Sequence, residues 1–566
     1  MNSKSSYALI LLLAAPWVSA SAAGVERSFP LLPTGETGPL GSFELIPVVE
    51  EILELRAEGA NLTFVGVPLP SGVVDIDLRR LYVDIDARVY VNGQPQSGPA
   101  DHGDLSIWRG KIRGRAGSDV LFGLSAHGCH GWVHDGTTRW NLLSSSGPDQ
   151  DWSAFTSRFV SEASIVSIGP ETGPVCATDT SGGSPILVDD IGPTHKSMSS
   201  RVATLECPIA IETDYQLYQT FGSLAAMQNY VTLLITAVSD RMLEQADVVL
   251  TYPYIGYYTT ANDPWQSQDN GGDCGAVLNE FQQAWNGNIP NGAALGHFIS
   301  GAHLGCGVAW VGVVCNPVWG FSLSCCINGG VSFPVQQGSN TWDFFVMAHE
   351  LGHNFGSYHT HDYCPPLDEC AGSCTGNTQC TNQGTNLSYC HGCPGGMNNI
   401  TTYYHPTVVA VMRQHAENSC LGSYCMDVSN YCVGFANSAY SGGAEMDWAG
   451  STSVTQNDFH VMVFSAVPGN LGLFFYGAGQ VFLPFGDGMR CVGGGGAAIQ
   501  RLGPPRQTQP LGHLARQVDF TTGPASSGPG QILPASTWNF QFWYRDPAGG
   551  PAGFNLSDAL RVTFCP

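Results

Sequence analysis

The feature that most constrains this chain is a short run in which two histidines stand four positions apart. His349 and His353 would lie on one face of a helix, one turn apart, so both imidazoles can reach the same metal ion. Glu350 stands beside the first histidine, where a carboxylate can accept a proton from water at that metal. Gly356 allows the helix to end, because glycine tolerates the left-handed conformation common after a last turn, and His359 can then return as a third ligand. Three imidazoles leave a fourth tetrahedral position for water, which is typical of a catalytic zinc site.

These residues form the extended pattern H-E-x-x-H-x-x-G-x-x-H, and the segment resembles the metzincin metallopeptidases. Within them, the abundant cysteines and the His361-Asp362 pair after His359 are most similar to the adamalysin (reprolysin) group. That group typically has an aspartate directly after the third histidine, whereas Thr360 and His361 intervene here.

The resemblance implies one catalytic Zn²⁺ ion bound by His349, His353 and His359, with Glu350 as the base that activates water. It also implies a protein or peptide substrate. A structural Ca²⁺ ion is possible, but no motif in the sequence supports it.

The N-terminus and the composition predict export. Residues 1–22 have a charged start, an apolar run from Tyr7 to Val18 and small residues typical of a signal peptide cleavage site. The alternative is an uncleaved anchor, but this run is short for a transmembrane helix, and no later stretch is apolar for long enough to span a bilayer. In an exported chain, 19 cysteines imply disulfides, and their odd number leaves at least one thiol unpaired or paired between chains.

The charge balance argues against a nucleic-acid partner. The formal net charge of the 566-residue chain is −24, and only 12% of its residues are charged. A phosphate backbone requires a basic face. Solubility is the simpler reason for this acidity.

Residues 23–200 are expected to form a β-rich prodomain followed by a linker. Residues 73–78 and 87–91 alternate in the manner of half-buried strands. Cys176 precedes a linker rich in Gly, Ser, Thr and Pro, and its setting resembles the segment of adamalysin prodomains whose cysteine holds zinc in the latent enzyme. A disulfide between Cys176 and Cys129 is the alternative, and the sequence leaves open which of the two cysteines is the switch.

Residues 201–424 are expected to form the zinc peptidase domain. Strands are predicted at 207–212, 248–254 and 307–314, with a long helix from Leu224 to Met242 between the first two. This order fits the α/β architecture that the resemblance implies, in which the strand at Gly307 is the sheet edge that pairs with substrate. The active-site helix should begin near Ser339 or Asn340, and six cysteines between 364 and 393 should be joined by disulfides.

Two further residues follow from the resemblance. Metzincins place a methionine turn under the zinc, and Leu387 occupies the position of that methionine, with Met397 as a second candidate. Tyr389 occupies the position at which some metzincins have a tyrosine that assists at the metal. The alternative for Tyr389 is a packing role.

Residues 425–566 differ in composition, with more glycine, proline and aromatic residues and several short strands typical of a β-sandwich. We expect an all-β accessory domain whose ligand is unknown. The whole chain is thus predicted to be multidomain, with a β-rich prodomain, an α/β metzincin domain built on a twisted mixed sheet with an active-site helix, and the all-β C-terminal domain. The rival interpretation is a secreted binding or adhesion protein on an inactive peptidase fold, although every ligand and the base are present.

Overall fold

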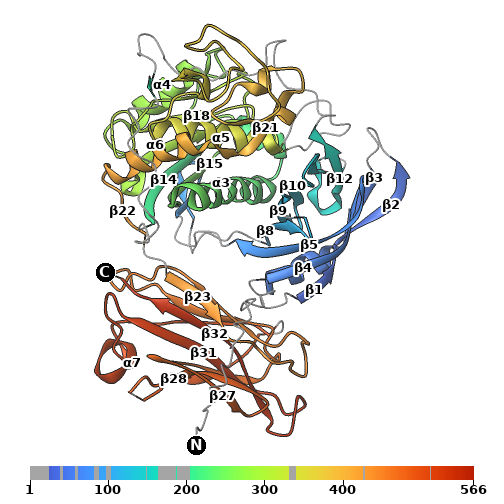
Figure 1. The fold of residues 1–566 in the computed structure, drawn as a ribbon, viewed down its shortest axis with the longest axis vertical. Coiled ribbons are helices and arrows are strands. Elements are labelled where there is room, and N and C mark those ends of the chain that lie inside the picture. The colour runs from blue at the N-terminus through green and yellow to red at the C-terminus, as the bar shows by residue number, and fades with distance from the viewer. Residues whose placement is uncertain are drawn as a thin grey trace, which may run out of the picture.

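A computed structural model describes residues 25–37, 43–57, 61–81, 88–96, 104–115, 117–147, 150–162, 186–187, 204–329, 340–424, 427–496, 498–509 and 512–565. The expected signal peptide and Cys176 lie outside the described residues. The chain forms three β-rich parts with a few helices (Figure 1), in agreement with a multidomain, β-rich protein.

The first part is a ten-stranded sheet with the order β1-β4-β5-β8-β9-β10-β11-β12-β3-β2. Its elements are β1 (Val25–Ser28), β2 (Leu31–Thr37), β3 (Phe43–Pro47), α1 (Val49–Glu54), β4 (Asn61–Leu69), β5 (Gly72–Leu81), β8 (Ser106–Ile112), β9 (Asp119–Ser125), β10 (Gly128–His134), β11 (Arg139–Ser145) and β12 (Thr156–Ser161). The aromatic rings of Phe29, Phe64, Phe122 and Phe159 pack together in its core. The strand predicted at 73–78 is confirmed as part of β5.

The second part contains a mixed sheet with the order β17-β18-β16-β14-β15-β6-β7, and β22 pairs with β14. Its strands are β14 (Leu205–Thr213), β15 (Val248–Tyr257), β16 (Leu295–Ile299), β17 (Gly307–Ala309), β18 (Phe321–Ser324), β22 (Gly422–Ser423), β6 (Arg88–Val91) and β7 (Gln94–Pro95). Its helices are α2 (Tyr215–Phe221), α3 (Leu224–Ala246), α4 (Cys274–Trp285), α5 (Asn340–Asn354) and α6 (Pro406–Glu417). The predicted strand–helix–strand start is confirmed, because β14 and β15 are parallel neighbours joined through α3.

The strand expected at 307–314 is shorter than predicted. β17 is the edge of the sheet, as expected, but it ends at Ala309. The backbone N–H groups of Gly312 and Val313 donate hydrogen bonds to the carbonyls of His353 and Asn354, each at 2.9 Å. These donors therefore satisfy the end of α5 instead of a neighbouring strand.

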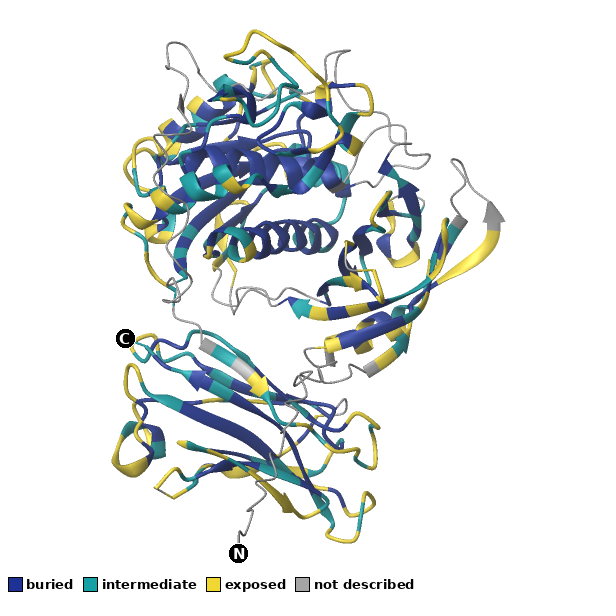
Figure 2. Ribbon diagram, viewed as in Figure 1, coloured by how far each residue is buried: buried dark blue, intermediate teal, exposed yellow. Residues whose placement is uncertain are grey.

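The first part is not separate from the second. The β6–β7 hairpin, which lies in sequence between β5 and β8 of the first sheet, extends the mixed sheet beside β15. Strand β9 packs on α3, where a Cβ at Gly123 would stand 2.6 Å from the Leu233 side chain. α3 is therefore buried along most of its length (Figure 2).

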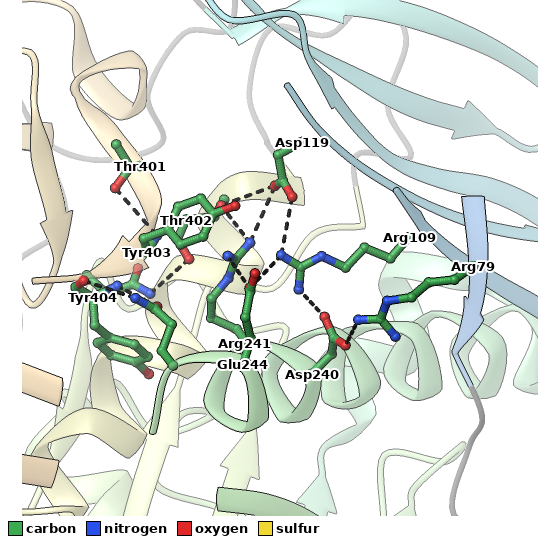
Figure 3. Close-up of polar contacts among 12 residues, drawn as sticks. Arg79, Arg109, Asp119, Asp240, Arg241, Glu244, Thr401, Thr402, Tyr403 and Tyr404 are labelled. Atoms are coloured by element: carbon green, nitrogen blue, oxygen red, sulfur yellow. Dashed lines mark hydrogen bonds and ion pairs between the residues drawn. The ribbon is translucent and has the colours of Figure 1, made fainter. Parts of the chain in front are cut away.

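Charged side chains also join the two parts, in a network drawn in Figure 3. Its members are Arg79, Arg109, Asp119, Asp240, Arg241 and Glu244. The Arg109 guanidinium, on β8, contacts Asp240 and lies 2.8 Å from Glu244, both on α3. The buried Arg241 of α3 in turn lies 3.4 Å from Asp119 of β9 and donates to Thr402 at 3.1 Å. Removing Asp119 would take one carboxylate partner from both buried guanidinium groups, Arg109 and Arg241, and weakening the pairing of a buried charge is costly.

The third part contains two sheets around one core. The five-stranded sheet has the order β23-β32-β31-β26-β29, the three-stranded sheet β24-β25-β30, and β27 and β28 form a hairpin. These elements are β23 (Asp427–Tyr431), β24 (Glu445–Ala449), β25 (His460–Phe464), β26 (Leu471–Gly477), β27 (Gly479–Phe485), β28 (Gly488–Gly493), β29 (Gln500–Gln507), β30 (Leu514–Gln517), α7 (Gly523–Ser526), β31 (Thr537–Arg545) and β32 (Phe554–Thr563). Alternate residues of β31, namely Trp538, Phe540, Phe542 and Tyr544, place their aromatic rings in this core.

The described cysteines form disulfides in the parts where the sequence concentrates them. The six cysteines of 364–393 pair among themselves, as expected: Cys364–Cys374, Cys370–Cys390 and Cys380–Cys393. Three more disulfides are Cys274–Cys306, Cys315–Cys420 and Cys432–Cys491.

Among the described helices, no single one is long and apolar enough to cross a membrane. The α2–α3 pair meets that test of length and composition only when the two are taken together, and it is bent by 106°.

Candidate metal centre

Helix α5 positions two of the predicted ligands. It begins at Asn340, as predicted, and buries Phe344, Ala348 and Leu351 along one stripe. Gly356 follows its end with φ of +93°, and its N–H donates to the His353 carbonyl at 2.8 Å. A Cβ at Gly356 would also stand 3.3 Å from the His415 side chain, so both the backbone conformation and the packing favour glycine here.

The chain reversal at Gly356 brings the three predicted histidines together. One ring nitrogen from each of His349, His353 and His359 lies within 4.8 Å of the others, and the Nε2 atoms of His353 and His359 are 3.2 Å apart. All three side chains are buried. Burial, and then the neighbouring imidazoles, hold the pKa of His349 and of His353 well below the usual value, so both rings are neutral.

Hydrogen bonds to two of these rings fix which nitrogen faces the cluster. His353 Nδ1 lies 2.7 Å from the Ser357 carbonyl oxygen, which only accepts, so Nδ1 carries the proton and Nε2 presents its lone pair. His359 Nδ1 lies 3.2 Å from Asp362 Oδ2 and is oriented in the same way. Burial is the largest single influence and raises the pKa of the Asp362 carboxyl group, but the hydrogen bonds from His359 and the charges of His361 and His359 together outweigh it, so the pKa is lowered. Asp362 therefore contacts the third histidine despite the two intervening residues.

The donor set fits a zinc ion. Both ring nitrogens of the buried His349 have no hydrogen-bond partner among the described residues, which is costly unless another group binds one of them. Neutral imidazoles with an accepting neighbour on the second nitrogen are the usual protein ligands of Zn²⁺. His361 stacks on His359 at 5.1 Å between ring centroids, and His359, His361 and Asp362 form a second, overlapping group of the same kind.

The carboxylate of Glu350 is buried beside the histidines and packs against the edge strand. A Cβ at Gly307, the first residue of β17, would collide with Glu350 Oε1 and stand 2.7 Å from Val346 Cγ2. Glycine at this position therefore lets β17 approach α5. The sequence placed Gly307 on the edge strand but gave no sign of its contact with Glu350, because the two residues are far apart in the chain.

Leu387 and Tyr389 both reach this region. Leu387 is buried with φ of +70°, and its Cδ1 would stand 3.0 Å from a Cβ at Gly352, which lies between the two histidine ligands in the sequence of α5. Its carbonyl accepts from the Thr360 N–H at 3.0 Å, which ties the turn to the loop after His359. The Tyr389 ring centroid lies 4.4 Å from that of His359 and 6.2 Å from that of His349.

The predicted linker also passes near the third histidine. Residues 186–187 form β13 (Ile186–Leu187), which pairs in parallel with β19 (Tyr363–Cys364). Tyr363 in turn shares a hydrogen bond of 2.8 Å with Ser357, between the hydroxyl groups. Cys129, in contrast, is a buried free thiol on β10, and burial raises its pKa to about 12. The alternative disulfide with Cys176 is therefore not formed in this structure.

One comparison with known proteins, a match to a family model, agrees with the geometry of this site. Residues 203–405 match the family model Reprolysin_5, described as Metallo-peptidase family M12. This part of the chain is thus similar to metallopeptidases, a class of hydrolases that use a metal, usually zinc. No curated protein matched the sequence. Among solved structures, the crystal structure of metalloproteinase-II from Bacteroides fragilis aligns at 11% identity with a TM-score of 0.36, over 64% of this chain and 93% of that one.

Proposed function

We propose that the protein is a secreted, zinc-dependent endopeptidase of the adamalysin-like type, made as a latent precursor. The observation that carries this proposal is that one nitrogen from each of three buried histidines meets at one place. Two of these histidines, His349 and His353, share helix α5 with Glu350. An inactive binding protein on the same fold is less well supported, because the three ligands and the carboxylate are all in place.

His349, His353 and His359 would hold the ion. When bound, Zn²⁺ lowers the pKa of a water and polarises a carbonyl group. Ser357 and Asp362 keep His353 and His359 in the tautomer that presents Nε2.

Glu350 would act as the proton carrier of the reaction. Its carboxylate takes a proton from the attacking water and passes it to the leaving amine. Packing against Gly307 limits the positions that this carboxylate can adopt. Tyr389, whose ring lies beside His359, would use its phenol to stabilise the charge that develops on the carbonyl oxygen.

A peptide substrate would bind in an extended conformation along β17. This strand is the free edge of the mixed sheet among the described residues, and its first residue touches Glu350. Pairing with the edge would supply backbone hydrogen bonds and place the scissile bond beside the carboxylate.

Gly307→Ala should lower kcat/KM by about 100-fold, since a displacement of about 1 Å at a catalytic group has an effect of this size. The added methyl group collides with Glu350 Oε1, so either the carboxylate or the edge strand must move. Zinc content should stay at the wild-type level. Gly372→Ala is the matched control, because nothing lies within 4 Å of its Cβ position. Unchanged kinetics in Gly307→Ala would show that Glu350 is not held by this contact.

Leu387→Met should leave peptidase activity close to wild type and change the free energy of unfolding by less than about 1.5 kcal/mol, because the two side chains have similar volumes. The turn needs an apolar side chain against Gly352, which methionine also provides. Thermal unfolding and peptide hydrolysis measure the two effects. A large gain in activity would instead mean that leucine at this position weakens the site.

Latency gives a separate prediction. A thiolate from Cys176 would occupy the zinc in the precursor, and the pairing of β13 with β19 supports a linker that runs beside the third ligand. Cys176→Ala should therefore cleave peptides before any processing, whereas the wild-type precursor stays inactive. Cys129→Ala is the control and should remain latent. A silent Cys176→Ala precursor that becomes active after linker cleavage would assign latency to steric blocking alone.

A further inference from the structure

Four cysteines gather at one end of the edge strand. Cys274 is the first residue of α4, Cys306 directly precedes β17, and Cys325 and Cys326 directly follow β18. Cys274 and Cys306 form a disulfide, while Cys325 and Cys326 are free thiols. Three of the four are buried, and Cys306 is half-buried.

The free thiols lie in contact with the disulfide. Cys325 Sγ is 3.9 Å from Cys274 Sγ and 3.2 Å from Cys326 Sγ. The pairing of Gly307 with Ser324 places Cys306 opposite Cys325 at the ends of the two strands. Cys325 Sγ thus has a disulfide sulfur at about van der Waals distance, which is the arrangement that thiol–disulfide exchange requires.

We propose that these cysteines form a thiol–disulfide exchange site, in which the disulfide moves from Cys274–Cys306 to Cys274–Cys325. The Cys325 sulfur attacks Cys274 Sγ, and the new bond forms as the bond to Cys306 breaks. The electron pair of the broken bond remains on Cys306 as a thiolate, and the Cys325 proton passes to the Cys326 thiolate. The exchange needs no external oxidant, because one disulfide is present before and after it.

Cys326 is suited to accept that proton. Its sulfur lies 3.2 Å from Cys325 Sγ, in a contact where either thiol can donate, and it accepts a hydrogen bond from the Gly305 N–H, also at 3.2 Å. The Cys325 thiol also donates to the Cys306 carbonyl. The hydrogen bond from Cys325 lowers the pKa of Cys326 despite burial, whereas burial raises the pKa of Cys325. Of the two thiols, Cys326 therefore ionises first, and its thiolate can then accept the proton of Cys325, which becomes a nucleophile only as that proton leaves.

The exchange would change which segment is tied to α4. In the structure, the disulfide holds the loop before β17, and after exchange it would hold the end of β18 while Cys306 is released. Cys306 is the most exposed of the four, so its thiol would be accessible to reagents that do not reach the buried cysteines. A single tetrathiolate metal site is the rival arrangement, since Cys274, Cys306 and Cys325 also meet the distance requirement for one ion.

The test is alkylation of the folded full-length protein with iodoacetamide at pH 8.5, followed by acid quenching and peptide mapping without reduction. The proposal expects alkylated Cys306 in the same molecules as a Cys274–Cys325 disulfide. Cys325→Ser should lose Cys306 labelling, and Cys207→Ser, which removes another buried free thiol, should keep it. Cys306→Ser, folded with oxidised glutathione as the oxidant, should form the Cys274–Cys325 disulfide. Detection of the Cys274–Cys306 disulfide alone in the wild type, with no labelled Cys306, would overturn the proposal. The proposal would also be overturned if the four cysteines were reduced and bound zinc in the purified chain.

Discussion

Glu350→Ala is expected to bind zinc as well as the wild-type protein and to lose peptidase activity by a factor of about 10³ or more. The histidines provide the ligands, so the metal should remain, but a positioned general base typically contributes about 10²–10⁴ to the rate. Glu350 is buried, and its carboxylate is held between α5 and Gly307, so solvent is a poor substitute for it. Zinc content and kcat/KM for a peptide substrate, measured on the same preparation, check both halves of this expectation.

Glu417→Ala is the matched control for this change. Glu417 is a helical glutamate at the end of α6, largely exposed and paired only with Arg413 among the described ion pairs. It should retain zinc and activity. Comparable hydrolysis by a folded, zinc-loaded Glu350→Ala protein would show that another group takes the proton.

His359→Ala should lower zinc occupancy and activity together. Loss of a residue that merely orients a ligand costs about 10–100-fold in metal affinity, so loss of a ligand should cost at least about 100-fold. Competition with a chromogenic chelator measures the zinc affinity directly. The physical reason is the cluster itself, in which His359 Nε2 lies 3.2 Å from His353 Nε2.

His361→Ala provides the matched comparison, because His361 stacks on His359 and is buried beside it. It should retain most of the zinc. Full zinc in His359→Ala, with loss of zinc in His361→Ala, would make His361 the third ligand.

Local pattern was enough to predict the elements that carry the site. The spacing of His349 and His353 indicated the helix, and the glycine at 356 indicated its end. These features depend on residues within a few turns of one another, for which periodicity and capping give direct signals.

Contacts between distant segments were not predictable in the same way. The contact of Gly307 with Glu350 depends on how closely two elements approach, which leaves no local signature. Likewise, β6 and β7 alternate like other strands of the first region, yet they join the mixed sheet. The valines at 313 and 314 extended the predicted strand because they are apolar, but they are buried in a turn whose N–H groups bond to the end of α5.

The pairing of the buried charged residues is another contact between distant segments that the sequence did not predict. Arg79 and Arg109 occur on strands, and Asp240 occurs on a helix that otherwise looks apolar, so none of them signals its partner. Their pairing reflects the docking of the first sheet on α3 (Figure 3). The low content of charged residues gave no indication of this network or of its position between the first and second parts.

The most direct test of the account is a metal-dependence measurement on the full-length protein after a cut in the linker between residues 178 and 200. Zinc content and casein hydrolysis are measured before chelation, after removal of metal, and after Zn²⁺ is added back. We expect about one zinc ion per chain, with loss of hydrolysis on chelation and recovery with zinc, and no hydrolysis by Glu350→Ala in any state. Hydrolysis that persists without metal, or none from a processed chain that holds its zinc, would contradict the assignment of a zinc endopeptidase.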